Sequence, residues 1–115
     1  MSLGSQSAVF SPQQIVCIES PKQYLYASVI QFIERQKNYW IRPLCLVNQG
    51  ESENNPQVMS LHRTSDVIIE SDRIREAWDT EILEFWTSLY DESVDFQDNS
   101  AGQAELHRFL RAVVW

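Results

Sequence analysis

The sequence has little of the material from which catalytic and cofactor-binding motifs are usually built. It contains only three glycines and two histidines among 115 residues. None of the glycines forms a G-x-G-x-x-G or P-loop pattern, so nothing indicates nucleotide binding through backbone amides. His62 and His107 are far apart, and neither has a Cys or His neighbour at the spacing of a metal site. We therefore predict a protein that is not an enzyme and that needs no cofactor and no metal.

Cysteine is also scarce, with only Cys17 and Cys45 in the chain. Each lies in an apolar stretch, where burial would raise the pKa of a thiol and make it a poor nucleophile. We interpret both as buried free thiols that pack as small hydrophobic side chains, while a disulfide between them stays open. The start of the chain is small and polar, without the cationic and apolar regions of a secretory signal, so we expect a cytoplasmic protein.

Long hydrophobic runs are missing as well. No run approaches the roughly 18 apolar residues that a membrane-spanning helix needs. The composition, 43% hydrophobic and 22% charged, is typical of a globular protein. We expect residues 13–115 to form a single domain, preceded by a flexible lead at residues 1–12 that ends in a Ser-Pro pair.

Positive charge is in short supply, and the deficit lies in the second half of the chain. Nine Lys and Arg stand against sixteen Asp and Glu, which gives a net charge of −7. Residues 1–64 carry five cations and four acids, whereas residues 65–115 carry four cations and twelve acids. This charge opposes attraction to phosphate, so nucleic acid is a disfavoured partner and a basic protein a favoured one.

Residues 21–34 allow two structures. The start "SPKQ" resembles a helix capping box with proline at the first helical position. Against a helix, the segment is rich in β-favouring Tyr, Val, Ile and Phe, and the similar run "NYWIRPLCLVN" follows a short polar break. We prefer a β-hairpin with its turn at residues 35–38, and the helix stays an alternative. Pro43 lacks an N–H for strand pairing and predicts a strand edge or a bulge.

Strands are expected on both sides of this hairpin, and helices after them. Residues 13–20 predict one strand and residues 58–71 one or two, with the polar loop "NQGESENNPQ" before the latter. From residue 71 the apolar period becomes helical, and the residues of the stripe are Ile74, Trp78, Ile82, Phe85, Trp86 and Leu89. A terminal helix is predicted over residues 103–115.

Strands followed by two C-terminal helices are typical of an α+β fold. We expect the N-terminal half to form a small antiparallel sheet or an SH3-like half-open barrel, with the helices against one face or end. On this arrangement Trp78 and Trp86 would be buried against the sheet.

An acidic helical surface is the leading candidate site. Glu81 and Glu84 lie in the first predicted helix and Asp91 follows it, while Tyr90 and Trp115 would add apolar contact area. We therefore predict a non-enzymatic protein-interaction or assembly protein that binds a protein partner, favoured to be basic. A homodimer through strand pairing or helix packing stays open.

The connector after the first predicted helix is strongly acidic. Its carboxylates are those of Asp91, Glu92, Asp95 and Asp98. Ca²⁺ takes oxygen ligands of this kind, but the spacing does not match an EF-hand loop. We interpret the connector as an ordinary acidic loop.

The stretch "ERQKNYWIRPL", residues 34–44, carries the alternative hypothesis. Binding of a single-stranded nucleic acid requires cations beside aromatic rings. In this stretch the cations would be Arg35, Lys37 and Arg42, and the aromatic ring would be that of Tyr39. Strand alternation, however, places Trp40 on the same face as Leu44 and Leu46, so we interpret Trp40 as a core residue. Nucleic-acid binding by the 35–42 hairpin is therefore the second hypothesis.

The segments "LYASVIQFIERQKNYWIRPLCLV" and "AWDTEILEFW" together resemble a family of small uncharacterised cyanobacterial proteins. The shared features are an aromatic-rich hairpin with an Arg-Pro-Leu step and an Asp-Thr-Glu sequence before an apolar helix. The resemblance implies a cytoplasmic protein of a photosynthetic bacterium and does not name an activity.

Overall fold

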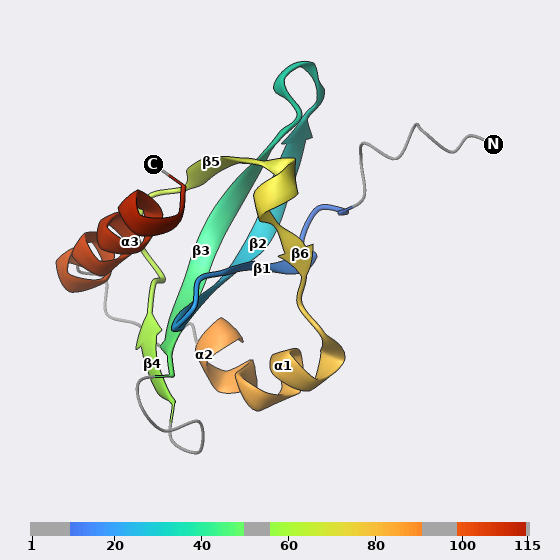
Figure 1. Cartoon of the computed structure of the whole chain (residues 1–115). Helices are drawn as coiled ribbons and strands as arrows, with labels where there is room; N and C mark the ends of the chain where they lie inside the picture. The colour runs from blue at the N-terminus through green and yellow to red at the C-terminus, as the bar shows by residue number, and fades with distance from the viewer. Residues whose placement is uncertain (1–9, 50–55, 91–98, 115) are drawn as a thin grey trace.

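The computed structural model describes residues 10–49, 56–90 and 99–114. Its strands form one antiparallel sheet in the order β4-β3-β2-β1-β6, with β5 also paired to β3 (Figure 1). The strands are β1 (Ile15–Glu19), β2 (Gln23–Ile33), β3 (Asn38–Asn48), β4 (Gln57–Ser60), β5 (Val67–Glu70) and β6 (Arg75–Glu76). The helices that follow are α1 (Asp79–Glu84), α2 (Trp86–Tyr90) and α3 (Ser100–Val113). The predicted α+β class is confirmed, with an antiparallel sheet from the N-terminal part and helices after it.

The long β2–β3 hairpin decides between the two structures allowed for residues 21–34. The segment is a strand, and the "SPKQ" signal belongs to the tight turn between β1 and β2. There the Gln23 N–H donates to the Ser20 hydroxyl at 3.0 Å, and the Ser20 N–H donates to the Gln23 carbonyl at 2.8 Å. Serine thus serves a turn here, which is its other common use. At the far end, a 3₁₀ turn at Glu34–Gln36 closes the hairpin, and Lys37 takes a left-handed φ of 57°.

Pro43 lies beside a β-bulge, as its missing N–H predicts. The pairing of β2 with β3 skips Leu44, which is the extra residue of the bulge. On the other side of β3, β5 pairs up to Ile41 and β4 pairs from Cys45 onward, so Pro43 lies in the gap between them. The proline therefore occupies a position where β3 needs no N–H donor.

The expectation that Trp40 is a core residue is wrong. Its side chain points outward with 36% exposure, while the neighbouring Tyr39 is 1% exposed. Trp40 lies outside the buried cluster of its own face and pairs with the exposed Ile68 of β5. The bulge also shifts the alternation of side chains along β3, which moves Leu46 to the opposite face. Leu46 therefore shares the core with Tyr39 and Ile41 rather than with Trp40.

The helices cover both faces of the sheet, whereas the sequence suggested one face or end. On one face, α3 packs Leu106, Phe109 and Leu110 against β-strand side chains such as Leu25 and Leu46. On the other face, Phe85 and Leu89 of the α1–α2 region pack with Tyr26, Cys45 and Val47. A strand buried on both faces has a continuous apolar sequence, which accounts for "IVCI" in β1 and "LCLV" in β3.

The first predicted helix begins later than its apolar stripe suggested. Residues 71–78 form a 3₁₀ turn, the short strand β6 and a connection, and α1 starts only at Asp79. β6 pairs with β1 at Val16 and Cys17, so its backbone groups bond to the sheet edge instead of forming a helical ladder. The terminal helix is confirmed, and its N-cap Asn99 places its start at Ser100.

Both packed clusters share the one sheet, so the described residues form a single compact domain. Of the lead expected at residues 1–12, Phe10 is described and packs its ring 5.3 Å from that of Tyr39. Among the described helices, none is long and apolar enough to cross a membrane.

Candidate functional site

An arginine held between two carboxylates joins β6, β1 and α1. Arg75 of β6 donates through Nη1 and Nη2 to the two oxygens of Glu81, each at 2.8 Å. Its Nε donates to Glu19 of β1. This fork-to-fork geometry is the strongest form of an arginine–carboxylate pair. The pair fixes α1 to the edge of the sheet.

Glu81 accepts two further hydrogen bonds. The Trp78 backbone N–H donates to its Oε1 at 2.8 Å, so Glu81 closes the first turn of α1 from the N3 position. The Tyr26 hydroxyl, which rises from the centre of the sheet, donates to its Oε2. The Glu81 side chain is only 13% exposed, so its carboxylate bonds to groups of the protein itself rather than facing the solvent.

The pKa values of this cluster follow from burial and hydrogen bonding. Burial alone would raise the pKa of Glu81, but the hydrogen bonds from Arg75, Tyr26 and Trp78 outweigh it and lower that pKa below its ordinary value. Burial, and then the hydrogen bond to Glu81, raises the pKa of the Tyr26 hydroxyl well above its usual range. The carboxylate is therefore charged and the phenol neutral at physiological pH.

A hollow of about 470 Å³ opens beside this cluster, and we call it the Trp78 hollow. Three carboxylates line it, from Glu19, Glu81 and Glu84, together with the rings of Tyr24, Trp78 and Phe85. The Arg75 guanidinium also lines it and lies 4.2 Å from the centre of the Trp78 ring. Three acids against one cation give the hollow a net negative charge.

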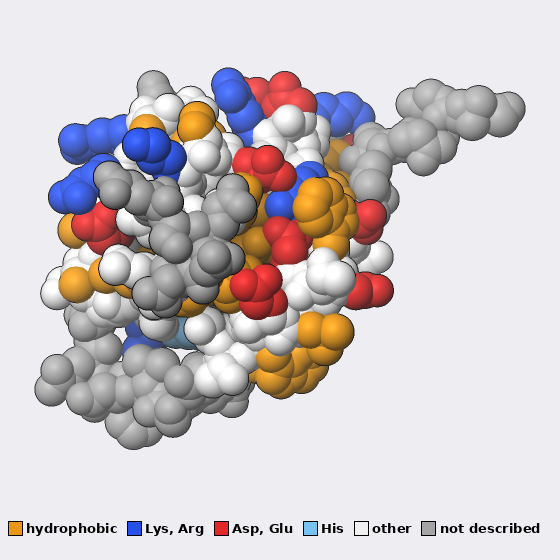
Figure 2. Space-filling view, turned by 60° about the horizontal axis from the view of Figure 1, so that its bottom comes forward, with side chains coloured by type: hydrophobic (Ala, Val, Ile, Leu, Met, Phe, Trp, Pro, Cys, Tyr) orange, Lys and Arg blue, Asp and Glu red, His pale blue; other side chains and the backbone are white. Residues whose placement is uncertain are grey.

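Large hydrophobic side chains are exposed around α1 and α2. Leu83 is 73% exposed, Trp78 56%, Trp86 54% and Tyr90 46%. The rings of Trp86 and Tyr90 contact each other with centres 4.5 Å apart. We call these four residues, together with the exposed Asp79 and Glu84, the α1–α2 surface. Figure 2 shows exposed hydrophobic side chains with Asp and Glu side chains close to them.

The expected burial of Trp78 and Trp86 against the sheet is therefore wrong. Trp78 precedes α1 as its N-cap residue and does not belong to the helix. Helix α1 ends at Glu84, and Phe85, with φ −106° and ψ 19°, separates it from α2. The break lets Phe85 and Leu89 take the inner face, which leaves Trp86 outside.

The structure separates the predicted partner-binding residues. Glu84 and Tyr90 are exposed on the α1–α2 surface, whereas Glu81 is occupied by its internal hydrogen bonds. Asp91 and Trp115 lie outside the described residues, as does the acidic connector with Glu92, Asp95 and Asp98. Sequence reasoning missed Trp78 and Leu83 as exposed residues, because a helical stripe does not reveal where the helix starts or breaks.

The alternative nucleic-acid residues do not form a joint stacking platform. Tyr39 is buried, and its hydroxyl accepts a hydrogen bond from the Phe10 N–H at 3.2 Å. Arg42 is paired with Asp66 at 3.2 Å, and the same carboxylate accepts the Trp40 indole N–H at 3.0 Å. Arg35 and Lys37 lie in the exposed turn of the hairpin.

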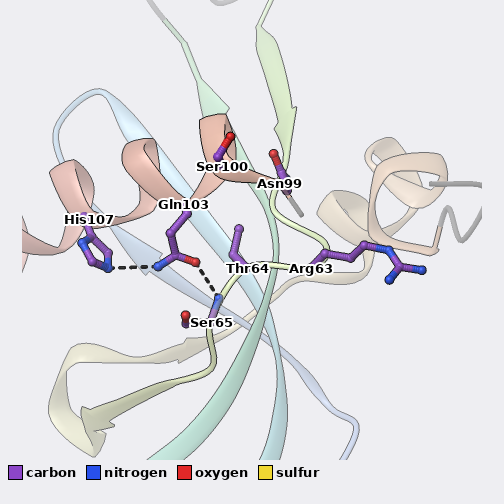
Figure 3. A pocket seen from close by; sticks show the side chains of 7 residues that line it. All are labelled: Arg63, Thr64, Ser65, Asn99, Ser100, Gln103 and His107. Carbon is purple, nitrogen blue, oxygen red and sulfur yellow. Dashed lines mark hydrogen bonds between the residues drawn. The ribbon is translucent and has the colours of Figure 1, made fainter. Parts of the chain in front are cut away.

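A second hollow, of about 520 Å³, lies at the start of α3. Its polar groups bond to one another: Gln103 accepts the Ser65 N–H at 2.7 Å and contacts His107 at 2.9 Å (Figure 3). The Arg63 side chain points away from these two residues in Figure 3. This arrangement fastens α3 to the segment before β5 and leaves few groups aimed at a ligand.

The thiols and metal-binding side chains offer no further centre among the described residues. Cys17 and Cys45 are free and buried, and burial raises the pKa of each thiol to about 12. Both pair with Tyr26 across the sheet, so two strand spacings, about 10 Å, separate them. That distance exceeds what a disulfide spans. Within the described ranges, no group of three or more His, Cys, Asp or Glu is placed to hold a metal.

Comparison with known proteins adds no relative. No protein-family model, no curated protein and no solved structure matches the chain. The resemblance to small cyanobacterial proteins therefore stays a prediction.

Proposed function

We propose that this protein is a non-enzymatic interaction or assembly protein that binds a basic protein partner through its α1–α2 surface. The observation that carries the proposal is the exposure of Trp78, Leu83, Trp86 and Tyr90 on one helical region. Exposed apolar groups rimmed by charge are typical of protein-binding surfaces, and tryptophan and tyrosine are the commonest residues at their energetic centres.

The charge of the region favours a basic partner. From residue 76 to residue 106 the chain carries nine acids and no Lys or Arg. A basic surface would be attracted to this region, and its association would be weakened by salt. The same charge disfavours a homodimer that brings two α1–α2 surfaces together, because each would face like charges.

Affinity capture with a matched pair of variants tests the proposal. Leu83→Ser removes the most exposed apolar side chain of the α1–α2 surface, and Ile68→Ser removes a comparable exposed side chain of β5 outside it. Tagged wild type and both variants would be incubated with a lysate of the native cells at low and moderate salt. We expect one basic protein to be captured by the wild type and by Ile68→Ser, and to be lost from Leu83→Ser.

Two results would count against the proposal. Equal capture by both variants would show that the α1–α2 surface is not the binding surface. Recovery of nucleic acid that depends on Lys37 and Arg42 would instead favour the hairpin hypothesis.

A further inference from the structure

The Trp78 hollow is lined by one arginine of the protein itself, and the contacts of this arginine show which interactions the hollow can make. The Arg75 guanidinium lies over the Trp78 ring at 4.2 Å and meets Glu81 with two parallel hydrogen bonds. Stacking on an aromatic face and forked pairing with a carboxylate are the two interactions in which arginine surpasses lysine.

The hollow keeps a carboxylate for a second cation. Arg75 pairs with Glu81 and Glu19, whereas the Glu84 carboxylate has no ion pair or hydrogen bond with any described residue. Glu84 lines the same hollow as the rings of Tyr24 and Trp78, and more than half of Trp78 is exposed. An exposed ring and an unpaired acid therefore border one concave space.

We propose that the Trp78 hollow receives an arginine side chain of the partner protein, whose guanidinium pairs with Glu84 and whose stem lies against Trp78. This inference rests on the proposed function and names the residue that the α1–α2 surface recognises. Arg75 and Glu81 act as positioning residues, because they hold Trp78 and the start of α1 in place before the partner arrives. A side chain entering such a prepared site loses little binding energy to reorganisation of the protein.

The charge balance excludes the opposite class of ligand. Three carboxylates face one guanidinium in the hollow, so a phosphate or carboxylate group would meet net repulsion. A neutral apolar side chain would leave Glu84 unpaired beside it. An arginine satisfies both the ring and the carboxylate.

Three short peptides test the inference on the full chain. The peptides Ac-Gly-Leu-X-Leu-Gly-NH₂ carry arginine, lysine or citrulline at X, where citrulline keeps the shape of arginine without its charge. Binding would be followed by NMR through the indole N–H signal of Trp78, which is assigned with Trp78→Phe. We expect the arginine peptide to bind about tenfold more tightly than the citrulline peptide, with lysine in between.

A matched pair of glutamate variants locates the binding. Glu84→Gln removes the unpaired carboxylate of the hollow, and Glu76→Gln removes an exposed carboxylate of the neighbouring β6 that does not line it. We expect Glu84→Gln to weaken binding of the arginine peptide about threefold or more, and Glu76→Gln to leave it within about twofold. Equal affinity for the arginine and citrulline peptides, or equal effects of the two variants, would overturn the inference.

Failure of this inference can be told apart from failure of the proposed function. Capture of the partner that is lost in Leu83→Ser but unchanged in Glu84→Gln would support binding through the α1–α2 surface. It would rule out recognition of an arginine by the Trp78 hollow. If Leu83→Ser captures the partner as well as the wild type does, the proposed function itself fails.

Discussion

Glu81 is the residue that connects the sheet, the edge strand and the first helix. Its carboxylate accepts from Tyr26 of β2, from Arg75 of β6 and from the N–H of Trp78, which precedes α1. A carboxylate enclosed in this way is costly to neutralise or remove, because its partners are left without an acceptor. Charge alone made Glu81 a candidate contact residue in the sequence, but its geometry gives it a stabilising role.

Replacing Glu81 should therefore destabilise the fold. We expect Glu81→Gln to lower the free energy of unfolding by about 2 kcal/mol, since it breaks a partly buried, forked pair with Arg75. Urea denaturation followed by circular dichroism measures this change. Glu84→Gln, on the same helix but exposed, should stay within about 0.5 kcal/mol of the wild type. Equal stabilities of the two variants would contradict the assigned role of Glu81.

The same residue makes stability depend on pH in the acid range. The pKa of Glu81 in the folded protein lies below its ordinary value of 4.5, so the unfolded chain binds the proton more readily. Its contribution is thus fully present above pH 4.5 and is lost as the pH falls through the folded pKa. We expect the stability difference between wild type and Glu81→Gln to shrink below pH 4.5 in urea titrations. A difference that stays constant down to the acid limit would contradict this account.

At the scale of elements, patterns within one segment were easier to predict than boundaries that depend on another segment. The hairpin of β2 and β3 and the terminal helix α3 follow from their own residues, and both were predicted. Pro43 predicted a strand edge or a bulge, but that Leu44 is the extra residue depends on how β3 meets β2, β4 and β5. This one extra residue places Leu46 on the face opposite Trp40.

The start of α3 shows how a single residue can define an element. Asn99 accepts the Gly102 N–H at 2.9 Å and donates to the carbonyls of Ser60 and His62 at 2.8 and 3.1 Å. A Cβ at Gly102 would lie 2.4 Å from Asn99 Nδ2, so glycine leaves the room this cap requires. The cap therefore joins α3 to β4 and to the segment after it.

Removing this cap should cost stability without touching the α1–α2 surface. We expect Asn99→Ala to lower the free energy of unfolding by about 1–2 kcal/mol, the usual range for a lost N-cap. Ser100→Ala, at the first helical position, should change it by less than about 0.5 kcal/mol. Urea denaturation of both variants tests this, and an Asn99→Ala protein as stable as Ser100→Ala would show that the cap contributes little.

At the scale of the whole molecule, the uneven charge seen in the sequence coincides with a structural division. The acidic second half supplies α1 and α2, which cover one face of the sheet and keep Trp78, Leu83, Trp86 and Tyr90 outside. Composition predicted an acidic second half, and the basic partner inferred from it stays a prediction. It could not predict which aromatic residues stay exposed, because Trp86 is exposed as a result of the helix break at Phe85.

The candidate site was accordingly predicted in part. Glu84 and Tyr90 were named from sequence and lie on the α1–α2 surface. The Trp78 hollow could not be foreseen, since it joins Glu19 and Tyr24 of the first two strands to Glu81 of α1, more than fifty residues further along the chain. Only strand register and the pairing of β6 with β1 bring them together.

Site-specific photocrosslinking in native cells tests the central claim most directly. A photoreactive phenylalanine analogue would replace Leu83 on the α1–α2 surface or, as a control, the similarly aliphatic and exposed Ile68 on β5. We predict that the probe at position 83 crosslinks one basic protein and that the probe at position 68 does not. Crosslinking of the same protein from position 68 with none from position 83 would contradict the assignment of the α1–α2 surface as the binding site.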